Sequence, residues 1–429
     1  MNIGVVALGK IGLPLAVQFA RSGHVVIGAD ISATAVDLIN AGVPPFPGET
    51  HLDEYLSEVV AAGKLSATTD VTEAVRRSDV VVVVVPLIVD RDKQPDFGAL
   101  DHATASIGAG LRPSTMVIYE TTLPVGTTRK RFAPALAAAS GLTLGHDLFV
   151  AFSPERVYSG RIFADLRRYP KLVGGIDEAS TTRAISFYNS VLQFDERDDL
   201  VRPNGVWNLG NSEAAELAKL AETTYRDINI GFANELARHA DQHDINIFDV
   251  IDACNSQPFS HIHQPGIAVG GHCIPVYPHF YLAGDPSALV PAAARRTNDA
   301  MPAYAVGRLA NRLGSLDGLT VAILGLSYRG GVKESAFSGA FATAEALVAA
   351  GAQPVVHDPL YSDEELGMAG MTPYHLGEPC DAAIIQADHT EYHSLRSADL
   401  GGAKVVLDGR RCLDPTTDLD VITLGGGGQ

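Results

Sequence analysis

The chain has 429 residues, of which 46 % are hydrophobic and 19 % are charged. This length corresponds to two to four ordinary domains, and the composition is that of folded cores rather than of an intrinsically disordered chain. The 32 Lys and Arg residues against 50 Asp and Glu residues give a net charge of −18. That balance argues against sequence-independent binding to nucleic acid or to an anionic membrane surface.

Signals for targeting and for disulfide formation are sparse. The N-terminus has no basic leader, and the longest apolar stretch, residues 80–89, is about half as long as a membrane span. The four cysteines have neither C-x-x-C spacing nor the density of a disulfide framework. We therefore expect a cytoplasmic protein in a reducing compartment, and we predict no metal site.

The first 150 residues alternate β-branched runs with Ala- and Leu-rich stretches, which is typical of βα units around a parallel sheet buried on both faces. From about Asn211 to Gln242 the apolar residues recur at helical spacing without a proline, so one long helix is predicted there. The strands predicted before it are Ile3–Leu8, His24–Ala29, Val80–Val85, Met116–Tyr119 and Phe149–Ala151.

A second βα series follows a loop-rich stretch. We predict an α/β protein in which two Rossmann-like, doubly wound parallel-sheet domains are joined by a long central helix. The predicted domains are residues 1–200, 201–300 and 301–429, and the glycine-rich tail, residues 425–428, is expected to be disordered. The strands of the second series are predicted at Leu319–Gly325, Pro354–Asp358, Ala382–Ile385 and Lys404–Leu407.

Gly9 and Gly12 follow the first predicted strand and match two of the three glycines of the G-x-G-x-x-G fingerprint. In that motif bare backbone lets a pyrophosphate approach a helix N-terminus. The first position is Ala7, which is a mild change if the turn keeps φ negative there.

Asp30 ends the next predicted strand, 18 residues after Gly12. A carboxylate at this place would accept hydrogen bonds from an adenine ribose. Ile31 and Ser32 follow it rather than an arginine, so NAD is favoured over NADP. The alternative is that Asp30 is only a solvated residue at a strand end.

The second series contains Gly325-Leu326-Ser327-Tyr328-Arg329-Gly330-Gly331, in which the fingerprint spacing fails. If the same architecture recurs there, this domain holds a different nucleotide, with Arg329 and Lys333 available for phosphate charge. Two solvated basic side chains on a surface loop are an equally good interpretation.

Cys273 lies in a turn crowded with glycines, Gly270-Gly271-His272-Cys273. Such a turn leaves backbone donors and space beside the thiol, which suits a nucleophile. A purely structural thiol remains the alternative at this point.

Several motifs occur in a fixed order along the chain. They are the glycine-rich start, the Val-Pro run before Pro95-Asp96, Thr121–Thr127, Ser153–Val157, Ala218-Lys219-Leu220, Gly270–Cys273, Lys333-Glu334-Ser335 and His357-Asp358-Pro359. Together they resemble the NAD-dependent nucleotide-sugar 6-dehydrogenases, the family of UDP-glucose and UDP-N-acetylmannosamine dehydrogenases. The Ser-Pro-Glu-Arg-Val form and the segments Tyr225–Asn229 and Ala233–Leu236 look closer to the N-acetylhexosamine branch.

The resemblance implies an oxidation of the C6 hydroxymethyl group of a nucleotide sugar to a carboxylate, with two NAD reduced. A thiolate adds to the intermediate aldehyde, and the thiohemiacetal becomes a thioester that water cleaves. By resemblance Cys273 is the nucleophile and Lys219 stabilises the C6 oxyanion. Glu155 orients or activates the hydrolytic water, and Thr122 holds a catalytic water.

The resemblance also implies where the ligands bind: NAD on residues 1–200, and the nucleotide sugar, expected to be a UDP-sugar, on residues 301–429. The central helix is expected to pair two chains in a homodimer. The expected cofactor-binding residues are Gly9, Lys10, Ile11, Gly12, Asp30, Pro86 and Thr122. The expected substrate-binding residues are Glu155, Arg156, Val157, Lys219, Gly270, Arg329 and Lys333.

The chain departs from the family at four positions. Besides Ala7, Thr223 replaces the usual Asn one turn after Lys219, and we keep it among the catalytic residues because it retains a hydroxyl. Tyr277 replaces an Asp that positions water, and Phe259 stands where an arginine would reach the sugar from the neighbouring subunit. These changes bear on the sugar recognised and on the division of acid–base roles.

The sequence therefore predicts an NAD-dependent 6-dehydrogenase of a UDP-N-acetylhexosamine such as UDP-N-acetylmannosamine, which forms a uronic acid of the kind used in polysaccharide biosynthesis. UDP-glucose or another nucleotide hexose is the alternative substrate. A 3-hydroxyacid dehydrogenase would share the N-terminal NAD site and a helical lysine but needs no thiol. A non-catalytic nucleotide-sugar binding protein is the alternative outside enzymes.

Overall fold

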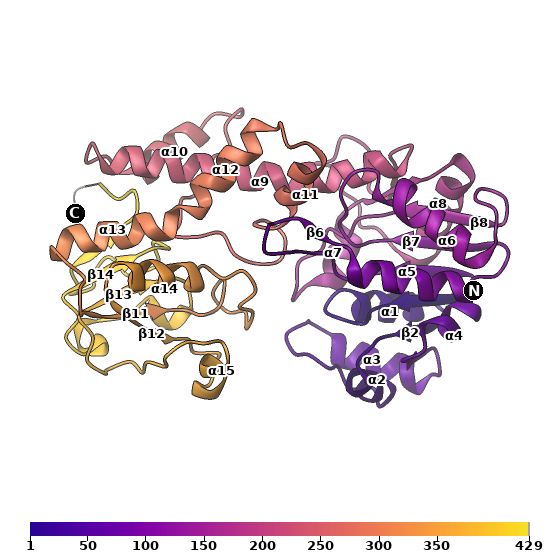
Figure 1. Ribbon diagram of the computed structural model, residues 1–429, viewed down its shortest axis with the longest axis horizontal. Helices are drawn as coiled ribbons and strands as arrows, with labels where there is room; N and C mark the ends of the chain where they lie inside the picture. Colours follow the sequence, from indigo (N-terminus) through magenta and orange to yellow (C-terminus); the bar gives the residue numbers. More distant parts are fainter. Residues whose placement is uncertain (428–429) are drawn as a thin grey trace. The chain divides into compact units, whose positions relative to one another are not determined.

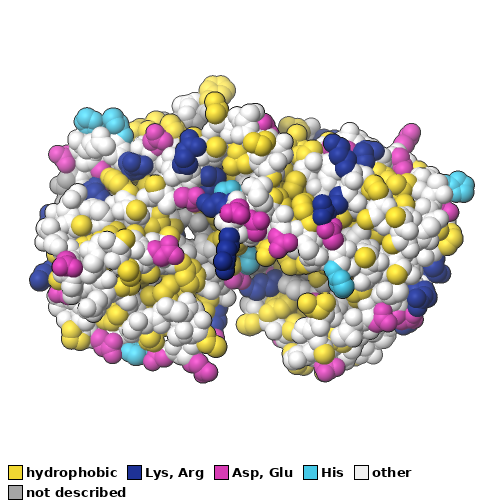
Figure 2. Space-filling model, in the orientation of Figure 1, with side chains coloured by type: hydrophobic (Ala, Val, Ile, Leu, Met, Phe, Trp, Pro, Cys, Tyr) yellow, Lys and Arg dark blue, Asp and Glu magenta, His cyan; other side chains and the backbone are white. Residues whose placement is uncertain are grey.

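The computed structural model describes residues 1–427, and the chain divides into two compact units (Figure 1). The first unit comprises Met1–Glu222 with His279–Gly284, and the second comprises Thr223–Pro278 with the chain from Asp285 onward. The division falls inside one helix, α9 (Ser212–Asp241). Figure 2 shows acidic and basic side chains interspersed on the visible face of each unit.

The first unit is built on an eight-stranded sheet in the order β10-β9-β8-β7-β4-β1-β2-β3. The six neighbouring strands β8-β7-β4-β1-β2-β3 are parallel and have the strand order of a dinucleotide-binding fold. Strand β9 is antiparallel to β8. The strands are β1 (Asn2–Val6), β2 (Val25–Ala29), β3 (Leu65–Thr68), β4 (Val80–Val83), β7 (Thr115–Tyr119), β8 (Leu148–Phe152), β9 (Lys171–Gly175) and β10 (Val206–Asn208), with a separate hairpin of β5 (Ile88–Val89) and β6 (Pro95–Asp96).

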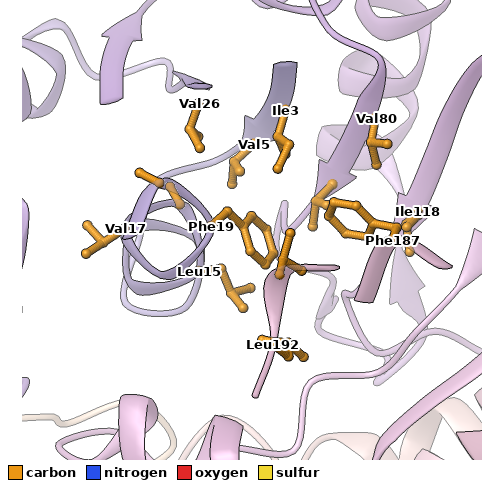
Figure 3. Close-up of a cluster of buried hydrophobic side chains, with 14 of the residues drawn as sticks. Ile3, Val5, Leu15, Val17, Phe19, Val26, Val80, Ile118, Phe187 and Leu192 are labelled. Atoms are coloured by element: carbon orange, nitrogen blue, oxygen red, sulfur yellow. The ribbon is translucent and has the colours of Figure 1, made fainter. Parts of the chain in front are cut away.

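Both faces of this sheet are buried, because side chains alternate between two helical layers. Val80 and Val82 belong to the cluster of Figure 3, in which Phe19 packs edge-on against Phe187 with ring centroids 5.5 Å apart. On the other face the Tyr119 ring stacks on Phe132 at 4.5 Å. Helices α1 (Gly12–Arg21), α3 (Leu52–Ala61), α7 (Ile162–Arg168) and α8 (Glu178–Val191) form the first layer, and α4 (Val71–Arg76), α5 (Gly98–Gly110) and α6 (Ala133–Ser140) form the second. Helix α2 (Ala33–Asn40) packs on α3 and β3.

The second unit carries a five-stranded, all-parallel sheet in the order β12-β11-β13-β14-β15. Val321 and Ile323 pack under α13 (Met301–Leu313) and α14 (Gly339–Ala349), whereas Ala322 and Leu324 face a second cluster around Tyr392. The strands are β11 (Thr320–Leu324), β12 (Gln353–His357), β13 (Ala382–Ile385), β14 (Val405–Asp408) and β15 (Val421–Thr423), and the remaining helices are α10 (Ile247–Asn255), α11 (Tyr277–Gly284), α12 (Leu289–Asp299) and α15 (Asp363–Met368).

The predicted fold class is confirmed: two doubly wound parallel-sheet folds and a long central helix are present. The strands that sequence patterns missed are β3, β5, β6, β9, β10 and β15, of which all but β9 have four residues or fewer. The predicted disorder of the tail is wrong for its described part, because Gly425 donates its N–H to Asp241 and accepts from Ile247 N–H at 2.8 Å. Gly428 lies outside the described residues. Among the described helices, none is long and apolar enough to cross a membrane.

Candidate active site

The fingerprint turn between β1 and α1 is closed by the backbone itself. Ala7 donates its N–H to Ala29 O at 2.8 Å, and its φ is +74°. The expectation that φ is negative there is therefore wrong, and the alanine is held in a left-handed conformation that costs a non-glycine residue about 1–2 kcal/mol. A Cβ on Gly12 would lie 1.9 Å from Ala7 O, so only glycine fits where α1 starts against this turn.

The Asp30 carboxylate lies beside that turn at the end of β2. One oxygen accepts the Leu8 N–H at 2.7 Å and the other accepts the Ser32 N–H at 2.9 Å. Asp30 is half-buried, while Gly9 and Lys10 are exposed, and a Cβ on Gly9 would meet nothing within 4 Å. Open backbone at a helix N-terminus with a reachable carboxylate alongside fits an adenosine diphosphate moiety.

Thr122 lies on the loop that leaves the carboxyl end of β7, next to the carboxyl end of β4. Thr121 ties the two ends together by donating its hydroxyl to Val85 O at 2.7 Å. Thr122 is buried and Pro86 is exposed. In a doubly wound sheet the crevice at the carboxyl ends of the strands is the ligand-binding edge, and these residues lie on it.

Glu216 of α9 holds the same loop by hydrogen bonds. Its carboxylate accepts the N–H groups of Gly126 and Thr128 at 2.5 and 2.8 Å and the Thr128 hydroxyl at 2.7 Å. Burial raises the pKa of Glu216 to about 7, against these hydrogen bonds, which lower it. Lys219 lies three residues further along the helix and is 8 % exposed, with Thr223, also buried, one turn beyond. The sequence analysis missed Glu216, although a Glu three residues before a helical lysine is visible in it.

Glu155 follows β8 and belongs to a buried ionic cluster. Lys171 Nζ lies 2.8 Å from Glu155 Oε2 and 2.7 Å from Glu120 Oε2. Burial acts to raise the pKa of Glu155, but the Lys171 ammonium outweighs it and holds that pKa below its ordinary value. Neither Glu120 nor Lys171 was predicted. In the sequence both are charged residues next to an apolar run: Glu120 directly follows one, and Lys171 directly precedes another.

Arg156 and Val157 turn in different directions. Arg156 forms an ion pair with Glu222 of α9 at 2.8 Å, and its own N–H donates to Glu155 Oε1 at 2.7 Å. Val157 packs against the main core of the first unit. Arg156 thus links the Glu155 loop to the helix that carries Lys219.

The Cys273 turn lies in the second unit and packs closely on the loop between β11 and α14. Gly271, at φ +90°, donates its N–H to Ala336 O at 3.0 Å, and a Cβ on Gly270 would lie 2.7 Å from the Tyr328 Cβ. Both glycines are thus required by the close approach. The Cys273 thiol is exposed, and its carbonyl accepts the Tyr277 N–H at 2.9 Å, so Tyr277 caps the turn through its backbone.

Two further contacts orient this turn. The segment leading to it is tied to α9, because Gly266 donates its N–H to Asn234 Oδ1 at 2.9 Å. The His272 imidazole lies 3.6 Å from a Glu334 carboxylate oxygen. Phe259, at one of the family-variant positions, is 92 % exposed.

Arg329 and Lys333, expected at the phosphates, lie on the loop between β11 and α14. Lys333 is paired with Glu365 at 2.5 Å and Arg329 is half-buried. Asp358, at the end of β12, is buried; its carboxylate accepts the Ser327 N–H at 2.7 Å and lies 3.2 Å from His389 Nε2.

Comparison with known proteins identifies the family of the chain. The models of the UDP-glucose/GDP-mannose dehydrogenase family match in three parts: the NAD binding domain at residues 1–192, the central domain at 213–299 and the UDP binding domain at 322–415. The chain belongs to this family. It is therefore an NAD-dependent nucleotide-sugar dehydrogenase, as its motifs predicted, and its last domain is of the UDP-binding type.

Individual relatives are similar over nearly their whole lengths. The UDP-N-acetyl-D-mannosamine dehydrogenase of Pyrococcus horikoshii is 35 % identical over 422 residues, which cover 96 % of each chain. A solved structure of UDP-D-ManNAc dehydrogenase from the same organism covers 100 % of both chains with a TM-score of 0.88 and 32 % identity. A UDP-glucose dehydrogenase structure from Pyrobaculum islandicum covers 96 % of this chain and 94 % of its own, with a TM-score of 0.83 and 28 % identity.

Proposed function

We propose that the substrate is a UDP-N-acetylhexosamine, with UDP-N-acetylmannosamine first, and that its C6 hydroxymethyl group is oxidised to a carboxylate. The observation that carries the choice of sugar is the 35 % identity over 96 % of the chain to a relative with that substrate in its name. Among the solved structures, the identity is 32 % to the UDP-D-ManNAc dehydrogenase and 28 % to the UDP-glucose dehydrogenase, so UDP-glucose is the second candidate.

The cofactor site fits NAD because its turn is open and its carboxylate is reachable. Gly9, Gly12 and the N-terminus of α1 would hold the pyrophosphate, and Asp30 the adenine ribose. Lys10, Ile11, Pro86 and Thr122 complete the proposed cofactor-binding residues. When bound, NAD supplies the acceptor for the two hydrides that leave C6.

The residues of the chain divide the remaining chemistry between them. Lys219, an ammonium at a buried helix position, would stabilise the oxyanion at C6. The Cys273 thiolate would add to the aldehyde carbon to give a thiohemiacetal, which would become a thioester on losing the second hydride. Water would then cleave the thioester and release the thiolate. Glu155 would take a proton from that water, while Thr122 and Thr223 offer hydroxyls.

The nucleotide part of the substrate is assigned to the last domain. Arg329 and Lys333 are the proposed phosphate contacts, with Gly270 at the sugar end, while Arg156 and Val157 belong to the loop that carries Glu155. We keep the division into an NAD domain (1–200), a central domain (201–300) and a nucleotide-sugar domain (301–429). The three matching family domains support it.

A homodimer is part of the proposal. On α9 the side chains of Tyr225 and Phe232, seven residues apart and 59 % and 52 % exposed, lie on one helix face with the half-buried Ile228 and Leu236. A helix of this length with an exposed apolar stripe favours pairing with a second copy. Light scattering of the wild type and of Phe232→Glu tests it, since only the wild type is expected to form the dimer. Cytoplasmic localisation is also proposed, in keeping with four cysteines that form no disulfide.

The test is NADH formation with a panel of UDP- and dTDP-hexoses, combined with the mass of the product. We expect two NADH per sugar and a uronic acid, with UDP-N-acetylmannosamine turned over best. Cys273→Ser should stop the reaction before the acid, whereas Cys254→Ser, on α10, should leave it unchanged. A wild type that binds UDP-sugars but never reduces NAD would make the chain a binding protein. Full turnover by Cys273→Ser would exclude the thioester route.

A further inference from the structure

Four ionisable side chains, one of them Glu155, meet in a buried cluster, each from a different part of the fold. Glu120 follows β7, Glu155 follows β8, Lys171 begins β9 and Tyr188 lies on α8. Lys171 Nζ contacts both carboxylates, at 2.7 and 2.8 Å, and the Tyr188 hydroxyl donates to Glu120 Oε1 at 2.6 Å. The Glu120 and Lys171 side chains are 0 % and 4 % exposed, and that of Glu155 is 11 % exposed.

Burying these charged side chains costs free energy that an apolar core at the same place would not cost. Removing charges from water costs several kcal/mol per ion, and well-packed apolar side chains usually do as well as a buried ion pair. Two carboxylates against one ammonium also leave a negative charge in excess. Glu155 is the member of the cluster that reaches the surface, on the ligand-binding edge of the sheet. We therefore look for the role of the cluster in its effect on the charge and orientation of the Glu155 carboxylate.

We propose that Lys171 is a positioning residue that holds the Glu155 carboxylate ionised and in one orientation, and that Glu120 and Tyr188 fix Lys171 in place. The inference rests on the proposed function, in which Glu155 accepts a proton from water. As that water attacks the thioester, its O–H bond breaks, a C–O bond forms, and the Cys273 thiolate leaves. An ionised Glu155 receives the proton.

The charges around Glu155 agree with this division. Burial raises the pKa of Glu120 to about 7, against the Lys171 ammonium, whereas the pKa of Glu155 is lowered, so as the pH falls Glu120 takes up a proton before Glu155 does. The other charged groups beside the cluster are Arg156, whose N–H donates to Glu155, and its ion-pair partner Glu222 on α9. Among the residues that the structure describes, Lys171 is the cation that forms an ion pair with the Glu155 side chain.

The first test is the pH dependence of kcat for NADH formation. Lys171→Met should move the acidic limb of the profile to higher pH by at least one unit, because a buried Glu155 without its cation ionises later. Lys171→Arg should restore the limb, and Lys404→Met, an exposed lysine, should leave it in place. Glu120→Gln should leave the limb where it is, because Glu120 already carries a proton at the pH of that limb. A Lys171→Met enzyme that is slower at every pH with an unmoved limb would overturn the proposal.

The second test does not depend on turnover. Urea unfolding of the wild type, Lys171→Met, Glu155→Gln and the double variant gives the coupling between the two side chains. We expect at least a tenfold coupling in the unfolding equilibrium constant at pH 7.5, and a coupling that becomes smaller as the pH is lowered until Glu155 takes up a proton. Additive effects at both pH values would overturn the proposal. If no sugar is oxidised but the coupling is found, the proposed function fails and the ionic contact stands. If Lys171→Met does not fold, Lys171→Gln, which removes the charge but keeps a hydrogen-bond donor, is tested for the same shift of the limb.

Discussion

The two α/β domains close their first turn in the same way but use it differently. In the first, Ala7 N–H donates to Ala29 O and Leu8 N–H donates to Asp30. In the second, Gly325 N–H donates to His357 O at 2.7 Å. Asp358, which follows β12, accepts the Ser327 N–H at 2.7 Å, the same distance as that between Leu8 N and Asp30.

The difference lies in what covers the carboxylate. Asp30 is half-buried, and α1 begins at Gly12, directly after the turn. Asp358 is 3 % exposed and lies against His389, and α14 begins only at Gly339, after a long loop. His389 Nδ1 accepts the Gly331 N–H, so its Nε2 carries the hydrogen donated to Asp358. The carboxylate at the end of the second strand therefore has two uses. Asp30 lies beside the candidate cofactor site, whereas Asp358 holds the loop before α14 by hydrogen bonds.

The largest effect is expected from Gly12→Ala. Its Cβ would collide with Ala7 O, so α1 has to move off β1, and we expect a loss of about 2–4 kcal/mol in unfolding free energy together with NAD binding. Gly9→Ala is the matched control: its Cβ meets no protein atom, so stability should be kept while NAD binding weakens. Calorimetry with NAD and urea unfolding measure both. Equal stabilities for Gly12→Ala and Gly9→Ala would contradict the geometry.

The paired substitutions Asp30→Ala and Asp358→Ala test the different use of the two carboxylates. Asp358→Ala leaves His389 and the Ser327 N–H without their buried partner and should cost about 2–4 kcal/mol of stability. Asp30→Ala should cost little stability but weaken NAD binding by about 10- to 100-fold, the equivalent of one or two hydrogen bonds to a charged group. The comparison fails if Asp358→Ala is as stable as Asp30→Ala.

The two domains should also respond oppositely when the pH rises from 5 to 7.5. In the first, Glu120 and Glu216 each have a pKa of about 7 against an ordinary 4.5, so the folded state binds the extra protons and stability falls across this window, by at most about 3 kcal/mol for each group. In the second, burial lowers the pKa of His357, so the unfolded state binds the extra proton below pH 6.5 and stability rises with pH.

Hydrogen exchange of the strand amides, corrected for intrinsic rates, measures the two domains separately. Contact with Glu378 raises the pKa of the exposed His375, so this group lowers the stability of the second domain as the pH rises. Its effect is small because solvent screens it. Glu120→Gln should reduce the response of the first domain alone, and the remaining response is that of Glu216. Parallel responses of β4 and β11 amides would show that the buried carboxylates do not set the difference.

The smallest effect is expected from Ala7→Gly. It gives the first domain the residue that the second has at the same turn, Gly325, and removes the cost of φ +74° for an alanine. The gain should be about 0.5–1 kcal/mol, since glycine also has a more flexible unfolded chain. The reverse exchange, Gly325→Ala, should destabilise, because φ there is +112° and the new Cβ would lie 2.5 Å from that of Ala387. A destabilised Ala7→Gly would show that the turn is not strained.

Much of the fold was predictable because it rests on local patterns. Uninterrupted β-branched runs and helical periodicity located the main strands and α9 within two residues of their ends. Short strands such as β10 (Val206–Asn208) escaped, because three residues carry too little pattern and their place comes from pairing with β9. The tail was mispredicted because glycine composition does not report that Gly425 packs on α9 and α10.

The sequence by itself determined the chemistry of the chain: a dinucleotide turn, a cysteine among glycines, a lysine on a long helix and the ordered motifs of one family. Only the tertiary structure decided the sign of φ at Ala7, the pairing of Lys333 with Glu365, and the position of Lys171 between Glu120 and Glu155. The physical reason is distance along the chain. Residue type and spacing set what a side chain is able to do, whereas its charge state and direction depend on partners that are brought together only when the sheet forms.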